Sequence, residues 1–481
     1  MDAAPHSTFV GSAIRWASVS QVVRQAVQLL TIVVLARSLT PSDFGLVTMA
    51  VVVVGFVGLF KDLSLGSSVI QRPATSVEWL STLFWLSAGL GVLVTGALLL
   101  AAPAIAYVYR EPALTDILRV LSVTFVITGL SVVHQAVLER QLRYGSVARV
   151  ETVAAVSGSM VALVMAASGG GVWSLVGQVL VTAAMGTALF WIVSAWRPRR
   201  LFQIRTALAA GAFGVGLTTF NVTNYASRNA DYFLIGRSLG PEQLGFYTLA
   251  YRLMLIPLQM VTSVVNRVMF PRLSMMQDDH DTFARVYLSG VAATAFAAFP
   301  IALGLAATAP RLIPVVLGSG WGPAIPVAII LSFVGVIQSV GASVGPVFLA
   351  TGAVKALARW GAVSSVVVVA AFFLGLPWGI VGVATAYLVA SLLLLYPSFS
   401  IALRPIGVDP KRILEVTLRP AAVALLMATV VVGVSRAIGD GLPDIAALTL
   451  EIGLGIVVYI GLSLIINREQ TRLVLGRVAR A

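Results

Sequence analysis

Long apolar stretches separated by short polar segments run along most of the chain. An α-helix needs about 20 mainly apolar residues to cross the hydrocarbon core of a bilayer. Divided at charged, glycine and proline positions, the pattern predicts an all-α polytopic membrane protein with about 14 transmembrane helices. These helices are predicted near residues 14–36, 44–60, 79–107, 114–136, 149–167, 172–194, 210–235, 243–266, 285–307, 323–350, 357–374, 379–402, 413–435 and 445–466.

Composition agrees with this interpretation and excludes other classes of protein. Of the 481 residues, 58% are hydrophobic and 11% are charged, and the mean hydropathy is +0.96. A soluble domain carries about 25% charged residues, so soluble enzymes and ordinary nucleic-acid binders are excluded. The absence of cysteine excludes disulfides and cysteine-ligated metals, and the scattered His6, His134 and His280 predict no metal site. The N-terminus lacks the pattern of a cleaved signal peptide.

The net charge of +13 follows the predicted topology. If the N-terminus is cytoplasmic, 23 lysines and arginines lie in or near cytoplasmic segments, against six arginines on the outer side. This is the bias that the positive-inside rule describes. It predicts that both termini are cytoplasmic and that the charge reflects topology rather than binding to nucleic acid. The six outer arginines are Arg37, Arg110, Arg119, Arg237, Arg311 and Arg436.

An internal repeat indicates how the helices are organised. Residues 36–50 (ARSLTPSDFGLVTMA) and 236–250 (GRSLGPEQLGFYTLA) align without gaps at an offset of 200 and share seven of fifteen positions. Both copies have a Pro-x-x-x-Gly turn, in which proline opens the next helix and glycine allows close packing. Six predicted helices separate the copies, so the two halves have parallel topology.

We therefore expect two six-helix lobes, residues 1–206 and 207–403, followed by a terminal helix pair and a basic cytoplasmic tail at 404–481. Transporters built from such repeats place their substrate between the lobes and alternate access by rocking one lobe against the other.

Polar residues gather on three of the predicted helices, two of which precede the repeat copies. They are Arg24, Gln28 and Thr31 in the first helix, Asn221, Asn224, Arg228 and Asp231 in the seventh, and Arg252, Gln259, Ser263 and Asn266 in the eighth. Helical spacing places each set along one face. At the offset of 200, the first set lies opposite Asn224, Arg228 and Asp231.

The cost of placing charge in lipid suggests what these residues do. Each arginine or aspartate at bilayer depth costs about 2.5–3.5 kcal/mol, so the side chains must face a wet cavity or a partner. An Arg228–Asp231 ion pair and an Arg252 that reaches the interface are the structural alternatives, whereas Arg24 has no acid nearby in its own helix. If they line a cavity, three arginines against Asp231 suit an anion, and the arginine fork suits phosphate.

Other patterns carry less information. The segment from Gly341 to Gly345 matches the Gly-x-Ser-x-Gly pattern of serine hydrolases, but it lies inside a predicted membrane helix with no strand before it, where helix packing by small residues explains it better. No nucleotide-binding glycine motif is found in the sequence.

Four segments resemble one known family. They are RNADYFLIGRSLGPEQLGFYTLAYRL (228–253), NRVMFPRLS (266–274), GSSVIQR (66–72) and QAVLERQLRYGSVARVE (135–151). Together they resemble the Wzx-type polysaccharide or oligosaccharide flippases of the multidrug/oligosaccharidyl-lipid/polysaccharide (MOP) exporter superfamily. The matching blocks contain Arg228, Asp231, Asn266 and Arg267, whereas Arg252 stands where a small or amide residue is expected.

The resemblance implies a transporter rather than an enzyme, located in a bacterial plasma (inner) membrane. It would flip an undecaprenyl-diphosphate-linked oligosaccharide from the cytoplasmic to the outer leaflet for exopolysaccharide, capsule or O-antigen synthesis. No cofactor is expected, coupling to a proton or sodium gradient stays open, and a polysaccharide polymerase and export machinery are candidate partners. The expected substrate-binding residues are Arg24, Gln28, Asn221, Asn224, Arg228, Asp231, Arg252 and Gln259.

Two alternatives to this function remain. One is another transporter of the same superfamily, such as a lipid II flippase or a drug antiporter. The other is a membrane polysaccharide polymerase or ligase, which the short predicted outer loops disfavour.

Overall fold

The computed structural model describes residues 23–62, 66, 68–69, 76–277, 279–439 and 441–467. Within them, the side chains of 209–220, 256–257, 260, 263–268 and 270–271 are left undescribed. The helices group into two compact units, Met1–Gly245 (unit 1) and Phe246–Ala481 (unit 2). The boundary between the units lies inside one continuous helix, α11 (Pro241–Ser274).

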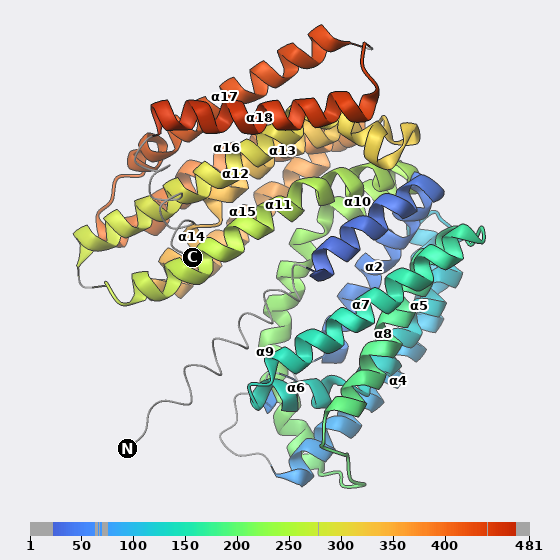
Figure 1. The fold of residues 1–481 in the computed structure, drawn as a ribbon. Helices are drawn as coiled ribbons and strands as arrows, with labels where there is room; N and C mark the ends of the chain where they lie inside the picture. The colour runs from blue at the N-terminus through green and yellow to red at the C-terminus, as the bar shows by residue number, and fades with distance from the viewer. Residues whose placement is uncertain are drawn as a thin grey trace. The chain divides into compact units, whose positions relative to one another are not determined.

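The first described element of unit 1 is a helix at residues 23–38. The unit continues through α2 (Pro41–Asp62), α4 (Val77–Tyr109), α5 (Leu114–Gly129), α6 (Val132–Arg140), α7 (Tyr144–Ala167), α8 (Val172–Val193), α9 (Ile204–Arg228) and α10 (Ala230–Leu239). Helices α7 and α8 run side by side, as do α4 and α5, and α2 packs on α5 (Figure 1).

Unit 2 contains the remaining helices, among which α12 packs on both α13 and α17, and α15 packs on α16 (Figure 1). They are α12 (His280–Leu317), α13 (Ala324–Gly341), α14 (Val344–Ala350), α15 (Val354–Gly375), α16 (Gly379–Leu403), α17 (Lys411–Ile438) and α18 (Asp444–Ile466). Short 3-10 turns lie at Ser319–Trp321, Leu376–Trp378 and Arg404–Ile406.

The predicted all-helical membrane fold is confirmed. Among the described residues, nine helices are long and apolar enough to cross a membrane, or ten if the bent pair α5 and α6 counts as one span. The count of 14 therefore stays a prediction. Large apolar side chains such as Leu100, Ile192 and Leu393, which are 85%, 73% and 68% exposed, cover the outer faces of these helices, as expected of surfaces that face lipid.

Three helices predicted as continuous are each divided in two. The α5–α6 pair bends by 43°, α9 gives way to α10 at Asn229, and α13 gives way to α14 at Ala342–Ser343. At each break a polar side chain bonds to a carbonyl of the preceding turn: Ser131 Oγ to Thr128, Asn229 Nδ2 to Tyr225 and Ser343 Oγ to Val340, at 3.0, 2.8 and 2.7 Å. Such bonds compete with the helical hydrogen-bond pattern.

The break at Ser343 adds detail to the interpretation of the Gly-x-Ser-x-Gly segment. The segment lies within the candidate span Ala324–Ala350, but it straddles the break, where Pro346 has no N–H to donate to the carbonyl of Ala342. The Ser343 side chain is buried and its hydroxyl lies 3.0 Å from the Tyr287 hydroxyl. Ser343 thus joins α12 to the start of α14, which is a packing role.

The two repeat copies meet in space. A methyl group on Gly45 would lie 1.8 Å from the carbonyl oxygen of Pro241, and one on Gly245 would lie 1.9 Å from that of Pro41. The first turns of α2 and α11 therefore pack reciprocally, each glycine against the proline that opens the other helix. The role in close packing that the sequence assigned to Gly45 and Gly245 is confirmed.

Candidate functional site

Arg24 is half-buried on the first helix, and its partner is an acid on a different helix. Its Nη1 donates to Glu151 Oε2 on α7 over 2.6 Å, with the two side chains 29% and 38% exposed. A comparison of positions within one helix could not find this partner, because the contact joins segments 127 residues apart. A pair this exposed keeps part of its hydration, so it can open at modest cost when another anion approaches.

Gln28 and Thr31 follow Arg24 at helical spacing but differ in exposure. Gln28 is exposed, whereas Thr31 is buried and its hydroxyl donates to the carbonyl of Val27 over 2.7 Å. The hydroxyl of Thr31 is therefore satisfied inside its own helix. Arg24 and Gln28 are the members of this predicted stripe that a ligand can reach.

Three predicted residues lie at the end of α9. Asn224 and Arg228 are exposed and Asn221 is half-buried. Asp231 lies beyond the break at Asn229, in the first turn of α10, and is 3% exposed. The predicted stripe from Asn221 to Asp231 therefore spans the break at Asn229, with the accessible residues before it and the buried Asp231 after it.

The Arg228–Asp231 ion pair is likewise not found. Arg228 forms no ion pair with a residue that the structure describes. Asp231 Oδ1 accepts the backbone N–H of Tyr232 over 2.8 Å, at a helix start where the helix dipole favours a carboxylate. Among the residues that the structure describes, the Arg228 guanidinium thus has no carboxylate partner, and Asp231 is buried.

Tyr225, which the sequence analysis did not select, holds α9 against α2. Its hydroxyl donates to the carbonyl of Val52 over 3.2 Å, and its ring lies 6.5 Å from that of Phe56. A methyl group on Gly55 would lie 2.1 Å from the Tyr225 hydroxyl. The absence of a side chain at Gly55 therefore admits Tyr225 and fixes the polar end of α9.

The remaining candidates lie on α11 in unit 2. Arg252 and Gln259 are exposed. An arginine that lines a cavity and one that reaches the interface are both exposed, so both interpretations of Arg252 stand. The side chains of Ser263, Asn266 and Arg267 lie outside the described residues.

The structure also reveals buried charges that the sequence analysis missed. Lys61 is 4% exposed and its Nζ donates to Thr128 Oγ1 over 2.8 Å. Glu451 is 1% exposed and forms an ion pair with Arg311, which also lies 3.8 Å from Asp444. The sequence signal was an acid in the middle of the otherwise apolar α18, since such residues are rare unless they are paired.

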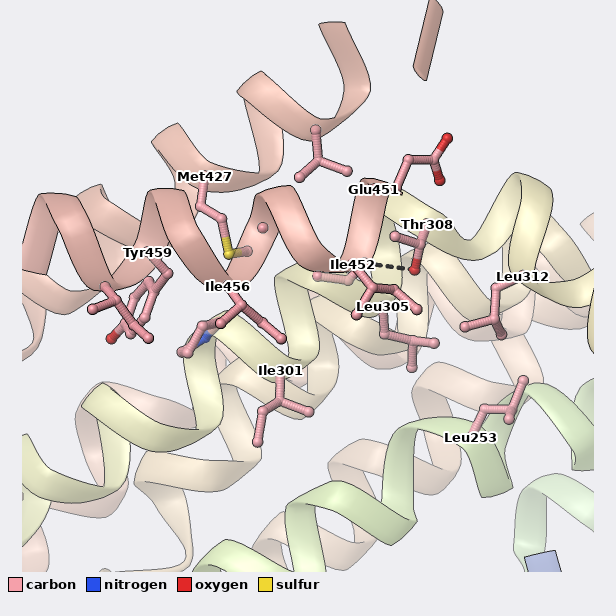
Figure 2. A pocket seen from close by; sticks show the side chains of 15 residues that line it. Leu253, Ile301, Leu305, Thr308, Leu312, Met427, Glu451, Ile452, Ile456 and Tyr459 are labelled. Atoms are coloured by element: carbon pink, nitrogen blue, oxygen red, sulfur yellow. Dashed lines mark hydrogen bonds between the residues drawn. The ribbon is translucent and has the colours of Figure 1, made fainter. Parts of the chain in front are cut away.

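A pocket of about 480 Å³ lies beside this ion pair in unit 2 (Figure 2). It is formed by α11, α12, α17 and α18, and its walls are mainly apolar. In Figure 2 the Glu451 carboxylate points away from the labelled apolar side chains of the pocket. The hydroxyl of Thr308 donates to the carbonyl of Gly304 over 2.9 Å and is thereby satisfied. The pocket can hold an apolar group but brings together no catalytic set.

In the part of the chain that the structure describes, no group of three or more His, Asp or Glu side chains could hold a metal ion. Apart from the buried Asp231, the candidate residues offer amide and guanidinium groups, which bind anions and hydroxyls.

Comparison with known proteins supports the membrane transport class. The chain is 27% identical to the lipopolysaccharide biosynthesis protein WzxC of Escherichia coli, with 82% of this chain and 81% of WzxC covered. It is 27% identical to the succinoglycan biosynthesis transport protein ExoT of Rhizobium meliloti, with 97% and 94% covered. It is also 27% identical to the teichuronic acid biosynthesis protein TuaB of Bacillus subtilis, with 73% of each covered.

Solved structures with the same fold are transporters. The lipid II flippase MurJ matches with a TM-score of 0.77 at 14% identity, covering 94% of this chain and 99% of MurJ. An inward-facing MATE transporter of the MOP superfamily matches with a TM-score of 0.63 at 16% identity, covering 81% and 98%. Identities this low show that the fold is shared and carry no further conclusion about this chain.

The predicted class, a membrane transporter rather than an enzyme, agrees with the names of these relatives. Residues 34–326, more than half of the chain, match the family described as polysaccharide biosynthesis protein. The chain therefore belongs to the polysaccharide biosynthesis protein family.

Proposed function

We propose that this protein flips an undecaprenyl-diphosphate-linked oligosaccharide from the cytoplasmic to the outer leaflet of a bacterial inner membrane, by alternating access. Exopolysaccharide, capsule or O-antigen synthesis would use the product. Support comes from the family, from relatives named for polysaccharide biosynthesis and transport, and from a fold shared with a lipid II flippase.

The observation that carries the proposal is the environment of Arg228. It is exposed at the end of α9, forms no ion pair among the described residues, and follows the exposed Asn224 by four positions. A guanidinium binds two oxygens of one phosphate through parallel N–H donors. Arg228 would therefore hold the diphosphate, with Asn221 and Asn224 donating to phosphate or sugar oxygens.

Arg24 would take part by exchanging its partner Glu151 for the diphosphate. With Glu151 bound, the guanidinium is neutralised, and a diphosphate would displace the carboxylate because it carries more charge. Gln28, four residues on, would contact the sugar. On α11, Arg252 and Gln259 would contribute from unit 2, and Asp231 would balance charge or carry a proton. We infer no cofactor, and the driving ion, a proton or sodium, stays open.

Export by arginine variants tests the proposal. Arg228→Ala and Arg24→Ala should each stop polymer export while the protein stays in the membrane, because transport loses a diphosphate ligand. The matched control is Arg412→Ala, an exposed arginine in the first turn of α17. Export and membrane abundance are measured together in a strain that lacks the native protein.

Normal export by both variants would contradict the site. A second candidate, lipid II transport, is suggested by the fold shared with MurJ. It predicts that loss of the protein arrests cell-wall synthesis rather than polymer export. If Arg412→Ala also stopped polymer export, export would depend on surface charge in general and not on Arg24 and Arg228.

A further inference from the structure

The arginines predicted to lie on the outer side are exceptions that need a reason. The positive-inside rule applies to lysine and arginine in short loops, so arginine is uncommon on the outer side. Two of the six have acidic partners. Arg311 pairs with Glu451, and Arg119 Nη1 lies 3.5 Å from Asp116.

Two others, Arg110 and Arg237, line one hollow of about 580 Å³ within unit 1. The hollow is formed by the end of α4, the turn into α5 and the last turn of α10 (the three helices are labelled in Figure 1). Tyr107, Glu111 and Thr115 also line it. Segments more than 120 residues apart in sequence thus bring two guanidinium groups to the same place.

These charges are not paired with each other. Among the described residues, neither Arg110, Arg237 nor Glu111 forms an ion pair, although all three border the hollow. Arg237 is half-buried, so it has lost part of its hydration without gaining a carboxylate. Each arginine lies at a helix C-terminus, where the helix dipole favours a cation. The dipole does not explain why both border one hollow.

The other side chains around the hollow suit a saccharide. Tyr107 is 85% exposed and offers an apolar ring face. Thr115 and Glu111 can exchange hydrogen bonds with hydroxyl groups. We propose that the hollow binds a carboxylate or phosphate group, presented either by an acidic sugar or by an anionic lipid headgroup. The location of the hollow on the outer side rests on the predicted topology, and anion binding there can be measured without transport.

The test uses the purified full chain in phosphatidylcholine nanodiscs. Calorimetric titration with a glucuronate-containing hexasaccharide (a hyaluronan fragment) should give saturable binding, and neutral maltohexaose should bind more weakly. Arg237→Gln and Arg110→Gln should each lower the affinity for the acidic hexasaccharide about tenfold, which equals a loss of roughly 1.4 kcal/mol of binding free energy. Glu111→Gln should raise the affinity for the acidic hexasaccharide, because a carboxylate that repels it is removed. Arg119→Gln is the matched control and should have no effect.

A second arm separates the two sources of the anion. Nanodiscs that contain phosphatidylglycerol are analysed by native mass spectrometry. If the ligand is a headgroup, the protein should retain this lipid and Arg237→Gln should release it, while the hexasaccharide fails to bind. The proposal is overturned if neither probe binds, or if Arg119→Gln reduces binding as much as Arg237→Gln. It is also overturned if Glu111→Gln weakens the acidic ligand.

Discussion

Individual side chains in this protein depend on partners that are distant in sequence. The sequence identified Arg24 as a charge that needs explanation, but its partner Glu151 is on another helix and only the fold brings them together. Arg311 was assigned to an outer loop, whereas it pairs with the buried Glu451. Charge at membrane depth was thus predictable, but the choice of partner was not, because it depends on which helix faces lie in contact.

At this scale we predict that Glu451→Gln destabilises the protein. Removing one member of a buried ion pair leaves the other charge uncompensated, at a cost of about 3 kcal/mol. Arg311 would keep Asp444 and the carbonyl of Gly439, to which its Nη2 donates over 2.9 Å, so the loss should not exceed this value. Denaturant unfolding in detergent measures the free energy change.

The control for that experiment is Glu415→Gln, an exposed position on α17. It should change the unfolding free energy by less than about 0.5 kcal/mol. Equal stability of the Glu451 variant and the unchanged protein would show that the ion pair contributes little.

Of the features of this protein, the helices were the easiest to predict from the sequence. Apolar runs located the helices because burial in lipid requires length and hydropathy, which are local properties. The breaks at Asn229 and Ser343 were not predicted, because they depend on local contacts: each side chain bonds to a nearby carbonyl, and Pro346 removes a backbone donor after the second break. The predicted role of the repeat glycines in close packing is confirmed, and the structure adds that the two Pro-x-x-x-Gly turns, at Gly45 and Gly245, pack on each other.

The reciprocal contact predicts equal sensitivity at both glycines. Gly45→Ala and Gly245→Ala each place a methyl group within 2 Å of a backbone carbonyl, so either should sharply reduce the amount of folded protein. Gly433→Ala in α17 is the control, because nothing lies within 4 Å of its added methyl group. It should be neutral or more stable by about 0.5–1 kcal/mol.

Fluorescence-detected size exclusion of the three alanine variants measures this effect. If one repeat glycine tolerates alanine and the other does not, the two halves of the contact contribute unequally to folding, contrary to the prediction.

For the whole molecule, composition led to the membrane class and the internal repeat and the resemblance led to the transporter class, with which the relatives agree. The division into two lobes, residues 1–206 and 207–403, and a terminal helix pair with a tail at 404–481 stays a prediction. The helices of the structure group into two compact units that divide after Gly245, inside α11, so the first turn of this helix belongs to unit 1 and the rest to unit 2. A repeat in the sequence shows where a helix pattern starts again, whereas packing decides which unit holds each helix.

The proposed function is the movement of a lipid-linked oligosaccharide across the membrane. The most direct measurement compares right-side-out and inside-out vesicles from a strain without the protein, using a membrane-impermeant glycosidase on the lipid-linked repeat unit. If the protein is a flippase, the repeat unit should accumulate on the cytoplasmic leaflet, and Arg228→Ala should not restore its transfer. Accumulation on the outer leaflet would rule out a flipping role and indicate a step after flipping.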